Sequence, residues 1–145
     1  MFQHVLVPID GSPTSESAVD KAIAIARAFG GSVTLVFVVD PYPFAGVGAD
    51  FAYGQTQYLS AARTQANSAL QTARSTIEAA GVPVTASLAE SHSVWRGILE
   101  ACDSGAVDLI VMGSHGRSGI EKVMLGSVAQ RVVSHAKVPV LVVRG

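Results

Sequence analysis

The sequence predicts an α/β fold, in which one parallel β-sheet carries helices on both faces. Short apolar runs alternate along the chain with longer segments whose apolar residues recur at helical spacing. The run Val33–Val39 is almost continuously apolar, as is typical of parallel strands buried on both faces. Because parallel neighbours are joined by a crossover that is usually a helix, this alternation indicates five strands and four helices in succession.

The first strand and the first helix are predicted between Phe2 and Gly31. The apolar run Phe2–Ile9 ends in the turn Asp10-Gly11, after which Ser12 can cap a helix and Pro13 fits its first turn. Gly30-Gly31 is expected to end this helix. Its apolar face comprises Val19, Ala22, Ile23, Ala26 and Phe29.

After the second strand, Val33–Val39, the sequence loses its periodicity. The stretch Pro41–Gly54 is rich in aromatic residues and predicts a mobile, partly apolar loop. From about Gln55 to Ala80, a mostly alanine stripe predicts a helix that packs closely on its neighbour, with Gly81 as its end.

The remaining pattern completes the alternation of strands and helices. No break in composition, internal repeat or low-complexity tract interrupts it, so we expect a single domain over residues 1–145. The expected strands are Val84–Ala89, Val107–Met112 and Pro139–Val143, and the expected helices run from Ser93 to about Ser104 and from Ser127 to about Ala136.

The composition favours a soluble protein of the reducing cytoplasm. Hydrophobic residues make up 49% of the 145 residues, and the single cysteine, Cys102, cannot form an intramolecular disulfide. We find no signal-peptide pattern and no apolar run of the roughly 20 residues that span a bilayer. The net charge of −1 predicts neither nucleic acid nor a membrane as partner. Residues 113–145 nevertheless carry +4 and the rest −5, which would suit a small anionic ligand in the C-terminal part.

A glycine-rich segment, GSHGRSGIEKVMLGS, follows the fourth predicted strand. A phosphate is bound by several backbone N–H groups of a chain that approaches without a Cβ, aided by the dipole of a following helix. Gly113, Gly116, Gly126 and Ser127 supply these parts, although glycines also suit a plain connection. The spacing matches neither a Walker A loop nor the dinucleotide fingerprint. Chemistry alone leaves both interpretations open.

Three side chains near this segment are further candidates. Parallel sheets bind ligands beyond the carboxyl ends of their strands, where both Asp10 and the glycine-rich segment fall. The guanidinium of Arg117 can fork onto phosphate oxygens, and the imidazole of His115 can donate to them. The alternatives are a solvated loop charge for Arg117 and a simple turn residue before Gly11 for Asp10.

The spacing Gly113-x2-Gly116-x9-Gly126-Ser127 resembles the nucleotide-binding signature of the universal stress protein family, G-2x-G-9x-G-(S/T). The likeness extends along the chain through VLVPIDGSPTSESAVDKAIAIA, VFVVD, VDLIVMGSHGRSG and GSVAQRVVSHAKVPVLVVR. The resemblance implies a doubly wound, Rossmann-like sheet of five parallel strands in the order 3-2-1-4-5. It also implies that ATP, or ADP or AMP, binds at the carboxyl ends of the strands.

The same resemblance assigns roles to the matching residues. Asp10 would lie near the ribose and the triphosphate. On chemical grounds, apart from the resemblance, Asp10 is also the candidate ligand for any Mg²⁺ or Mn²⁺ that accompanies the nucleotide. The backbone of Val38 would meet the adenine. The other implied contacts are Pro8 and Ile9 beside Asp10, and Gly113, Gly116, Gly126, Ser127 and Val128 at the phosphates and ribose.

We therefore expect an ATP-binding stress or regulatory protein with slow or no hydrolysis, since no catalytic constellation stands out. An ATP-hydrolysing or phosphotransferring enzyme is one alternative, and a nucleotide-free dimeric scaffold is another. The apolar last strand, Val138–Val143, falls at the sheet edge in the family's strand order and predicts a homodimer. The sequence does not identify a regulatory protein partner.

Overall fold

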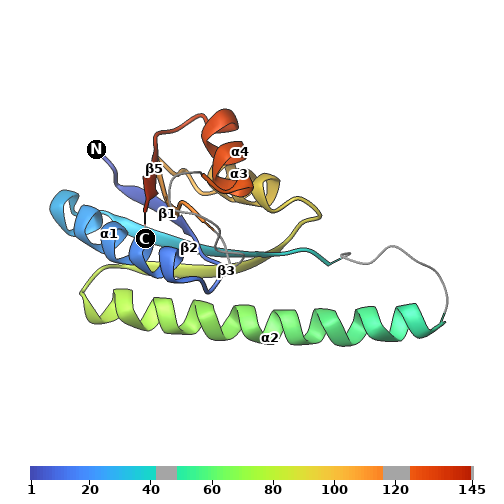
Figure 1. Ribbon diagram of the computed structural model, residues 1–145. Coiled ribbons are helices and arrows are strands. Elements are labelled where there is room, and N and C mark those ends of the chain that lie inside the picture. The colour runs from blue at the N-terminus through green and yellow to red at the C-terminus, as the bar shows by residue number, and fades with distance from the viewer. Residues whose placement is uncertain (42–48, 116–124, 145) are drawn as a thin grey trace.

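The strands of the computed structural model form one parallel sheet in the order β3-β2-β1-β4-β5 (Figure 1). The structure describes residues 1–41, 49–115 and 125–144. Within them, the predicted sheet and its strand order 3-2-1-4-5 are confirmed. The strands are β1 (His4–Pro8), β2 (Ser32–Val39), β3 (Val84–Glu90), β4 (Leu109–Gly113) and β5 (Val140–Val143).

Helices cover both faces of this sheet, as predicted. In Figure 1, α1 (Pro13–Phe29) and α2 (Ala49–Ala79) lie on one side of it, and α3 (Val94–Ser104) and α4 (Ser127–His135) on the other. Because successive side chains of a strand point to opposite faces, β1 sends Val5 and Val7 to the α1–α2 side and Leu6 to the α3–α4 side. The sheet is thus buried between two apolar layers.

The ends of α1 agree with the sequence. The Ser12 hydroxyl accepts the N–H of Ser15 at 3.3 Å, and Gly30 takes the left-handed conformation (φ 67°) that ends the helix. Phe29 differs from its expected place on the apolar face, because it is 43% exposed and contacts Phe2 edge to face instead.

The predicted loop Pro41–Gly54 is wrong in its last part, because α2 begins at Ala49 rather than at Gln55. Residues 42–48 lie outside the described residues. Each added helical residue gains a hydrogen bond, and Gly54 costs only about 1 kcal/mol relative to alanine, so the helix continues through it. Figure 1 shows the first turns of α2 extending past the sheet, which explains why no apolar stripe marks them.

The chain changes direction between β1 and β4. After β1 it passes to α1 on one face, whereas β4 leads toward α4 on the other, so these two neighbouring strands form a topological switch point. Among the described residues, no helix is both long and apolar enough to cross a membrane.

Candidate functional site

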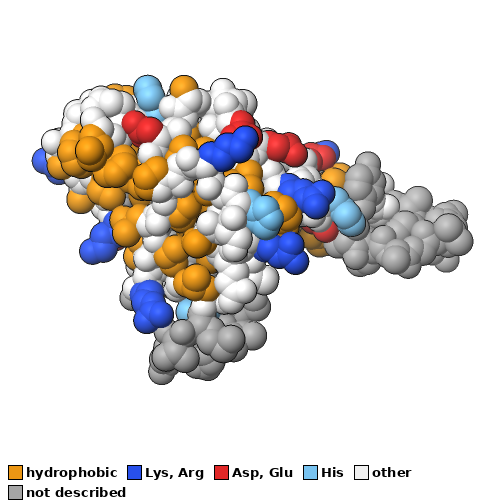
Figure 2. All heavy atoms as spheres, turned by 90° about the horizontal axis from the view of Figure 1, so that it is seen from above, with side chains coloured by type: hydrophobic (Ala, Val, Ile, Leu, Met, Phe, Trp, Pro, Cys, Tyr) orange, Lys and Arg blue, Asp and Glu red, His pale blue; other side chains and the backbone are white. Residues whose placement is uncertain are grey.

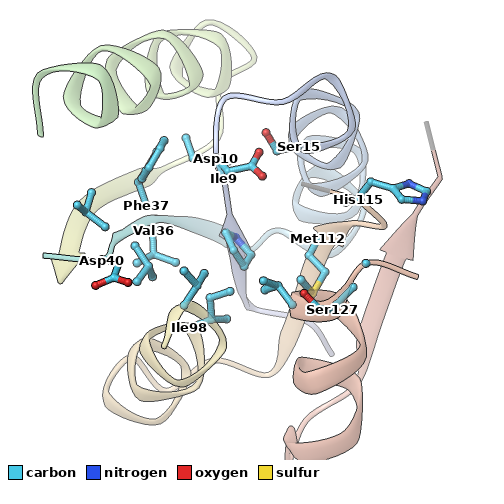
Figure 3. Close-up of a pocket in the computed structure, with 18 of the residues that line it drawn as sticks. Ile9, Asp10, Ser15, Val36, Phe37, Asp40, Ile98, Met112, His115 and Ser127 are labelled. Atoms are coloured by element: carbon cyan, nitrogen blue, oxygen red, sulfur yellow. The ribbon is translucent and has the colours of Figure 1, made fainter. Parts of the chain in front are cut away.

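A cavity of about 620 Å³ opens at the switch point, beyond the carboxyl ends of β1, β2 and β4 (Figure 3). Its walls come from elements that are far apart in the sequence. Asp40 and Ser127 lie on opposite sides of it in the figure. The lining includes Ile9 and Asp10 after β1, Val36 to Val39 on β2 with Asp40 after it, Val94 and Ile98 on α3, Met112 to His115 at the end of β4, and Gly126 to Val128 at the start of α4.

The backbone of Val38 presents a donor and an acceptor to this cavity. The last hydrogen bond between this end of β1 and β2 runs from the N–H of Ile9, just after β1, to the Val36 carbonyl at 2.9 Å. On the other side of β2, the Val39 carbonyl accepts from Ser91, so Val39 faces β3. Backbone groups alternate in direction along a parallel strand, and Val38 therefore faces the side from which β1 has turned away. Within the described chain no strand partner remains there for its N–H and C=O.

Close packing of α3 holds this part of β2 in place. A Cβ on Gly97 would lie 2.9 Å from a methyl group of Val38, so glycine is required for the approach of the helix. Val94 and Ile98, on the same side of α3, then form an apolar wall of the cavity. Together with the Val38 backbone, this wall makes a slot suited to a flat, hydrogen-bonding ring.

The opposite side of the cavity is formed by the N-terminus of α4. The first hydrogen bond within this helix runs from the Gln130 N–H to the Gly126 carbonyl at 3.0 Å, so the N–H groups of Ser127, Val128 and Ala129 have no acceptor inside the helix. No side chain caps the helix. These N–H groups and the helix dipole favour an anion at this end.

Gly126 contributes differently from our expectation that its N–H faces a phosphate. That N–H donates to the Ser114 carbonyl at 2.7 Å, which joins the start of α4 to the end of β4. The free backbone donors of this segment are therefore those of Ser127, Val128 and Ala129, which all line the cavity.

Gly113 is required by packing. A Cβ at this position would lie 2.6 Å from the Thr14 hydroxyl oxygen and 2.9 Å from its carbonyl carbon. The same hydroxyl donates a hydrogen bond to the His115 carbonyl. The first glycine of the signature thus allows the first turn of α1 to lie against the end of β4.

Asp10 stabilises a turn, as considered above, and also lies at the cavity. One carboxylate oxygen accepts the Ser12 N–H at 2.9 Å, which stabilises the turn before α1. The side chain also lines the cavity. In the described residues no group of three or more His, Cys, Asp or Glu side chains could hold a metal by itself. A single carboxylate is, however, what Mg²⁺ commonly takes when phosphate oxygens supply other ligands.

The other side chains predicted to contact a phosphate are not seen to point into the cavity. The His115 imidazole pairs with the Ser114 hydroxyl at 3.0 Å, and its buried Nε2 has no hydrogen-bond partner in the described region. In Figure 3 the ring points away from Asp10 and Ser127. A contact between this ring and a phosphate would require another rotamer, and remains a prediction. Gly116 and Arg117 lie outside the described residues.

Sequence reasoning missed part of the lining. Asp40 follows the predicted strand Val33–Val39 as directly as Asp10 follows the predicted strand Phe2–Ile9, so the same signal was available for it. Its carboxylate pairs with the His92 ring at 3.2 Å and lies at the cavity. Tyr58 and Gln65 reach the cavity from α2. No local pattern marks them, because the placement of that helix depends on its packing against the sheet.

Comparison with known proteins identifies the family. The model of the universal stress protein family matches residues 1–144. The chain belongs to the universal stress protein family. A universal stress protein of Methanocaldococcus jannaschii is 35% identical over 144 residues, which are 99% of this chain and 83% of the relative.

Two solved structures of similar fold extend this finding. The hypothetical protein MJ0577 of Methanocaldococcus jannaschii matches with a TM-score of 0.89 and 25% identity, covering 100% of this chain and 97% of the other. A universal stress protein in complex with cAMP matches with a TM-score of 0.73 and 26% identity, covering 99% of this chain and 97% of the other. The likeness to universal stress proteins therefore covers the whole fold.

Proposed function

We propose that this member of the universal stress protein family is a single cytoplasmic domain that binds ATP in the cavity and acts as a nucleotide-dependent regulatory protein. One observation carries the proposal: the open backbone pair of Val38 and the free N–H groups of α4 face the same cavity from opposite sides. A donor and an acceptor side by side match the Watson–Crick edge of adenine. The relative in complex with cAMP supports an adenine nucleotide as ligand.

In this proposal the nucleotide spans the cavity from β2 to α4. The adenine lies between the Val38 backbone and the apolar wall of α3, and Asp10 contacts the ribose. The phosphates lie at the N–H groups of Ser127 and Val128. Pro8 and Ile9 support the Asp10 turn, and Gly113, Gly116, Gly126, His115 and Arg117 complete the phosphate side.

A divalent cation would accompany the phosphates. Mg²⁺ or Mn²⁺ would neutralise their charge, with the Asp10 carboxylate as the protein ligand. One oxygen of that carboxylate already accepts a hydrogen bond from Ser12, so the other is the candidate for the cation.

Slow or no hydrolysis agrees with the carboxylates of the described lining. An efficient ATPase orients a water at the γ-phosphate and stabilises the charge that develops there. Asp10 is engaged in its turn, and Asp40 lies across the cavity from Ser127, paired with His92. We therefore propose that the nucleotide acts through differential binding to two states of the protein rather than through turnover.

We further propose a homodimer formed through Val138–Val143. In the described sheet, β5 pairs only with β4, and its Leu141 side chain is 40% exposed. An apolar edge strand that carries no charge is prone to pair with another chain. Antiparallel pairing of two copies about a two-fold axis would cover both edges.

Calorimetric titration of the protein with ATP, cAMP and GTP in the presence of Mg²⁺ tests which nucleotide the cavity binds. We expect ATP to bind more tightly than GTP, because guanine presents the opposite donor and acceptor to Val38. A Gly126→Val variant should weaken ATP binding by at least about tenfold, which corresponds to about 1.4 kcal/mol. Lys137→Ala, on an exposed side chain, should bind like the wild type.

The outcomes separate the three candidate functions. Equal ATP affinity in the Gly126→Val and Lys137→Ala variants would remove the glycine-rich segment from the site. A dissociation constant of about 1 mM corresponds to a binding free energy of only about −4 kcal/mol. If ATP does not bind even at this concentration, the result would favour the nucleotide-free scaffold. Phosphate release faster than about 1 s⁻¹ would favour the enzyme.

A further inference from the structure

A cationic cluster surrounds Trp95 on the outer surface of α3 and α4. The guanidinium carbon of Arg96 lies 5.0 Å from the centre of the indole ring, and that of Arg131 lies 5.6 Å from it. The imidazole of His135 stacks on the same indole, with ring centroids 4.6 Å apart and an angle of 31°. Figure 2 looks onto this face and shows Lys or Arg and His side chains gathered beside hydrophobic ones.

Among the carboxylates that the structure describes, the two guanidinium groups have no partner. Among the described residues the ion pairs are Arg63–Glu90, Arg74–Glu78 and His92–Asp40. Glu100 lies one helical turn after Arg96 but does not come within the 4.0 Å of an ion pair. The indole thus holds two like charges near each other that no acid of this region neutralises.

Stacking leaves the hydrogen-bonding edges of the two guanidinium groups available, whereas Nδ1 of His135 already contacts the Arg131 carbonyl oxygen at 2.9 Å. A guanidinium that lies over an indole uses its face, while its N–H donors point outward in its plane. Arg96, Arg131 and His135 are exposed and Trp95 is half-buried, so water reaches these edges. The planar fork of donors matches a carboxylate, which it can bind in a bidentate way.

The cluster is separate from the cavity, although both use the same helices. Val94 and Ile98 on α3 and Val128 on α4 line the cavity, whereas Trp95 and Arg131 belong to the outer cluster. Trp and Arg are, with Tyr, the residue types enriched among the few residues that contribute most of the binding energy in protein interfaces. A Trp flanked by unpaired Arg side chains therefore has the composition of a protein-docking site rather than of a solvated helix face.

We infer that this cluster is a docking site for a short acidic segment of a partner protein. Asp or Glu side chains of that segment bind Arg96 and Arg131, and an apolar part of it covers the indole. Duplex DNA is a poorer match, because stable binding uses about six to ten phosphate contacts, more than this cluster offers. The overall charge of −1 likewise provides no long-range attraction to polyanions or anionic membranes. The inference does not depend on nucleotide binding.

Tryptophan fluorescence tests the inference directly, since Trp95 is the only tryptophan of the chain. The full chain is titrated with octaglutamate, and with octaglutamine as the uncharged control. We expect a saturable change in emission with octaglutamate only, and its loss at about 0.5 M NaCl, where charges are screened within about 4 Å.

Two matched variants locate the binding. The double variant Arg96→Gln/Arg131→Gln should bind octaglutamate at least about tenfold more weakly. Arg27→Gln removes the same type of charge from an exposed position on α1, in the opposite layer, and should leave the affinity unchanged. Both replaced side chains of the double variant are exposed, so it should still unfold cooperatively, with a loss of only about 1 to 2 kcal/mol from the two contacts with the indole.

Several results would overturn the inference. One is the absence of any fluorescence response to octaglutamate up to about 1 mM, since a dissociation constant above this value would be too weak to assign to a docking site. Another is equal affinity of the double variant and the wild type for octaglutamate. Tighter binding of duplex DNA or phosphatidylserine vesicles than of octaglutamate at the same salt would assign the cluster to another partner. Displacement of octaglutamate by ATP would place the peptide in the cavity instead, whereas failure of ATP to bind leaves this inference intact.

Discussion

At the scale of single residues, the glycines of the signature differ in what they do. Spacing alone suggests that all of them expose N–H groups to a phosphate. The structure instead shows that Gly113 makes room for Thr14 and that the Gly126 N–H joins α4 to the end of β4. A local motif indicates where glycine is needed, but the neighbour that requires it comes from elsewhere in the chain.

Gly113→Ala should therefore destabilise the fold itself. The new Cβ would lie within 2.9 Å of the Thr14 carbonyl carbon, and backbone cannot move aside as a flexible side chain can. Overpacking of this kind costs about 1 to 3 kcal/mol, which denaturant unfolding would measure.

Gly54→Ala provides the control with the opposite sign. A Cβ at Gly54 meets nothing within 4 Å, and the residue lies inside α2. Alanine should stabilise the helix by about 0.5 to 1 kcal/mol. Equal effects of the two substitutions would contradict the contact with Thr14.

At the scale of elements, the sequence predicts whether a segment is a helix or a strand more reliably than it predicts where that helix or strand begins and ends. Capping by Ser12 and the left-handed Gly30 are local, and both ends of α1 are as expected. The start of α2 is not, because its first turns extend beyond the sheet and carry no apolar stripe. The sequence also does not predict the functional consequence of strand length. The N–H and C=O groups of Val38 lack a strand partner only because β2 continues after β1 has ended.

The edge strand β5 carries the prediction on assembly. Leu141→Lys should place two like charges across the proposed two-fold contact and convert the dimer to a monomer. Light scattering coupled to gel filtration would measure this, at about 10 μM protein. Thr85→Lys introduces the same charge at an exposed position of β3, the opposite edge strand, and should leave a dimer. A monomeric wild type at this concentration would rule out the proposed pairing.

At the scale of the whole molecule, the helix layers on the two faces of the sheet bury some reactive side chains and leave others exposed to solvent. Cys102 lies in the layer between the sheet and α3 and is only 6% exposed. Burial, and secondarily the charge of Asp103, raises the pKa of its thiol above the ordinary value of 9.0. The folded protein therefore keeps this thiol protonated and unreactive at neutral pH.

The shifted pKa links stability to alkaline pH. Above pH 9.0 the unfolded chain loses the thiol proton before the folded protein does, so the free energy of unfolding should fall as pH rises from there toward the higher folded pKa. Urea unfolding at several pH values would measure this decline. The decline should be smaller in Cys102→Ala, and an identical profile in both proteins would refute the link. Alkylation by iodoacetamide at pH 8 should require unfolding.

The sequence by itself determined the order of elements, the parallel sheet, the capping residues and the family. These features depend on chemistry that is local in the chain: periodicity of apolar side chains, capping hydroxyls and the spacing of glycines. Only the tertiary structure decided that the Val38 backbone opens into the cavity and that Arg96 and Arg131 meet on Trp95. Such contacts depend on strand register and on the packing of helices against the sheet, which join residues that no local pattern relates.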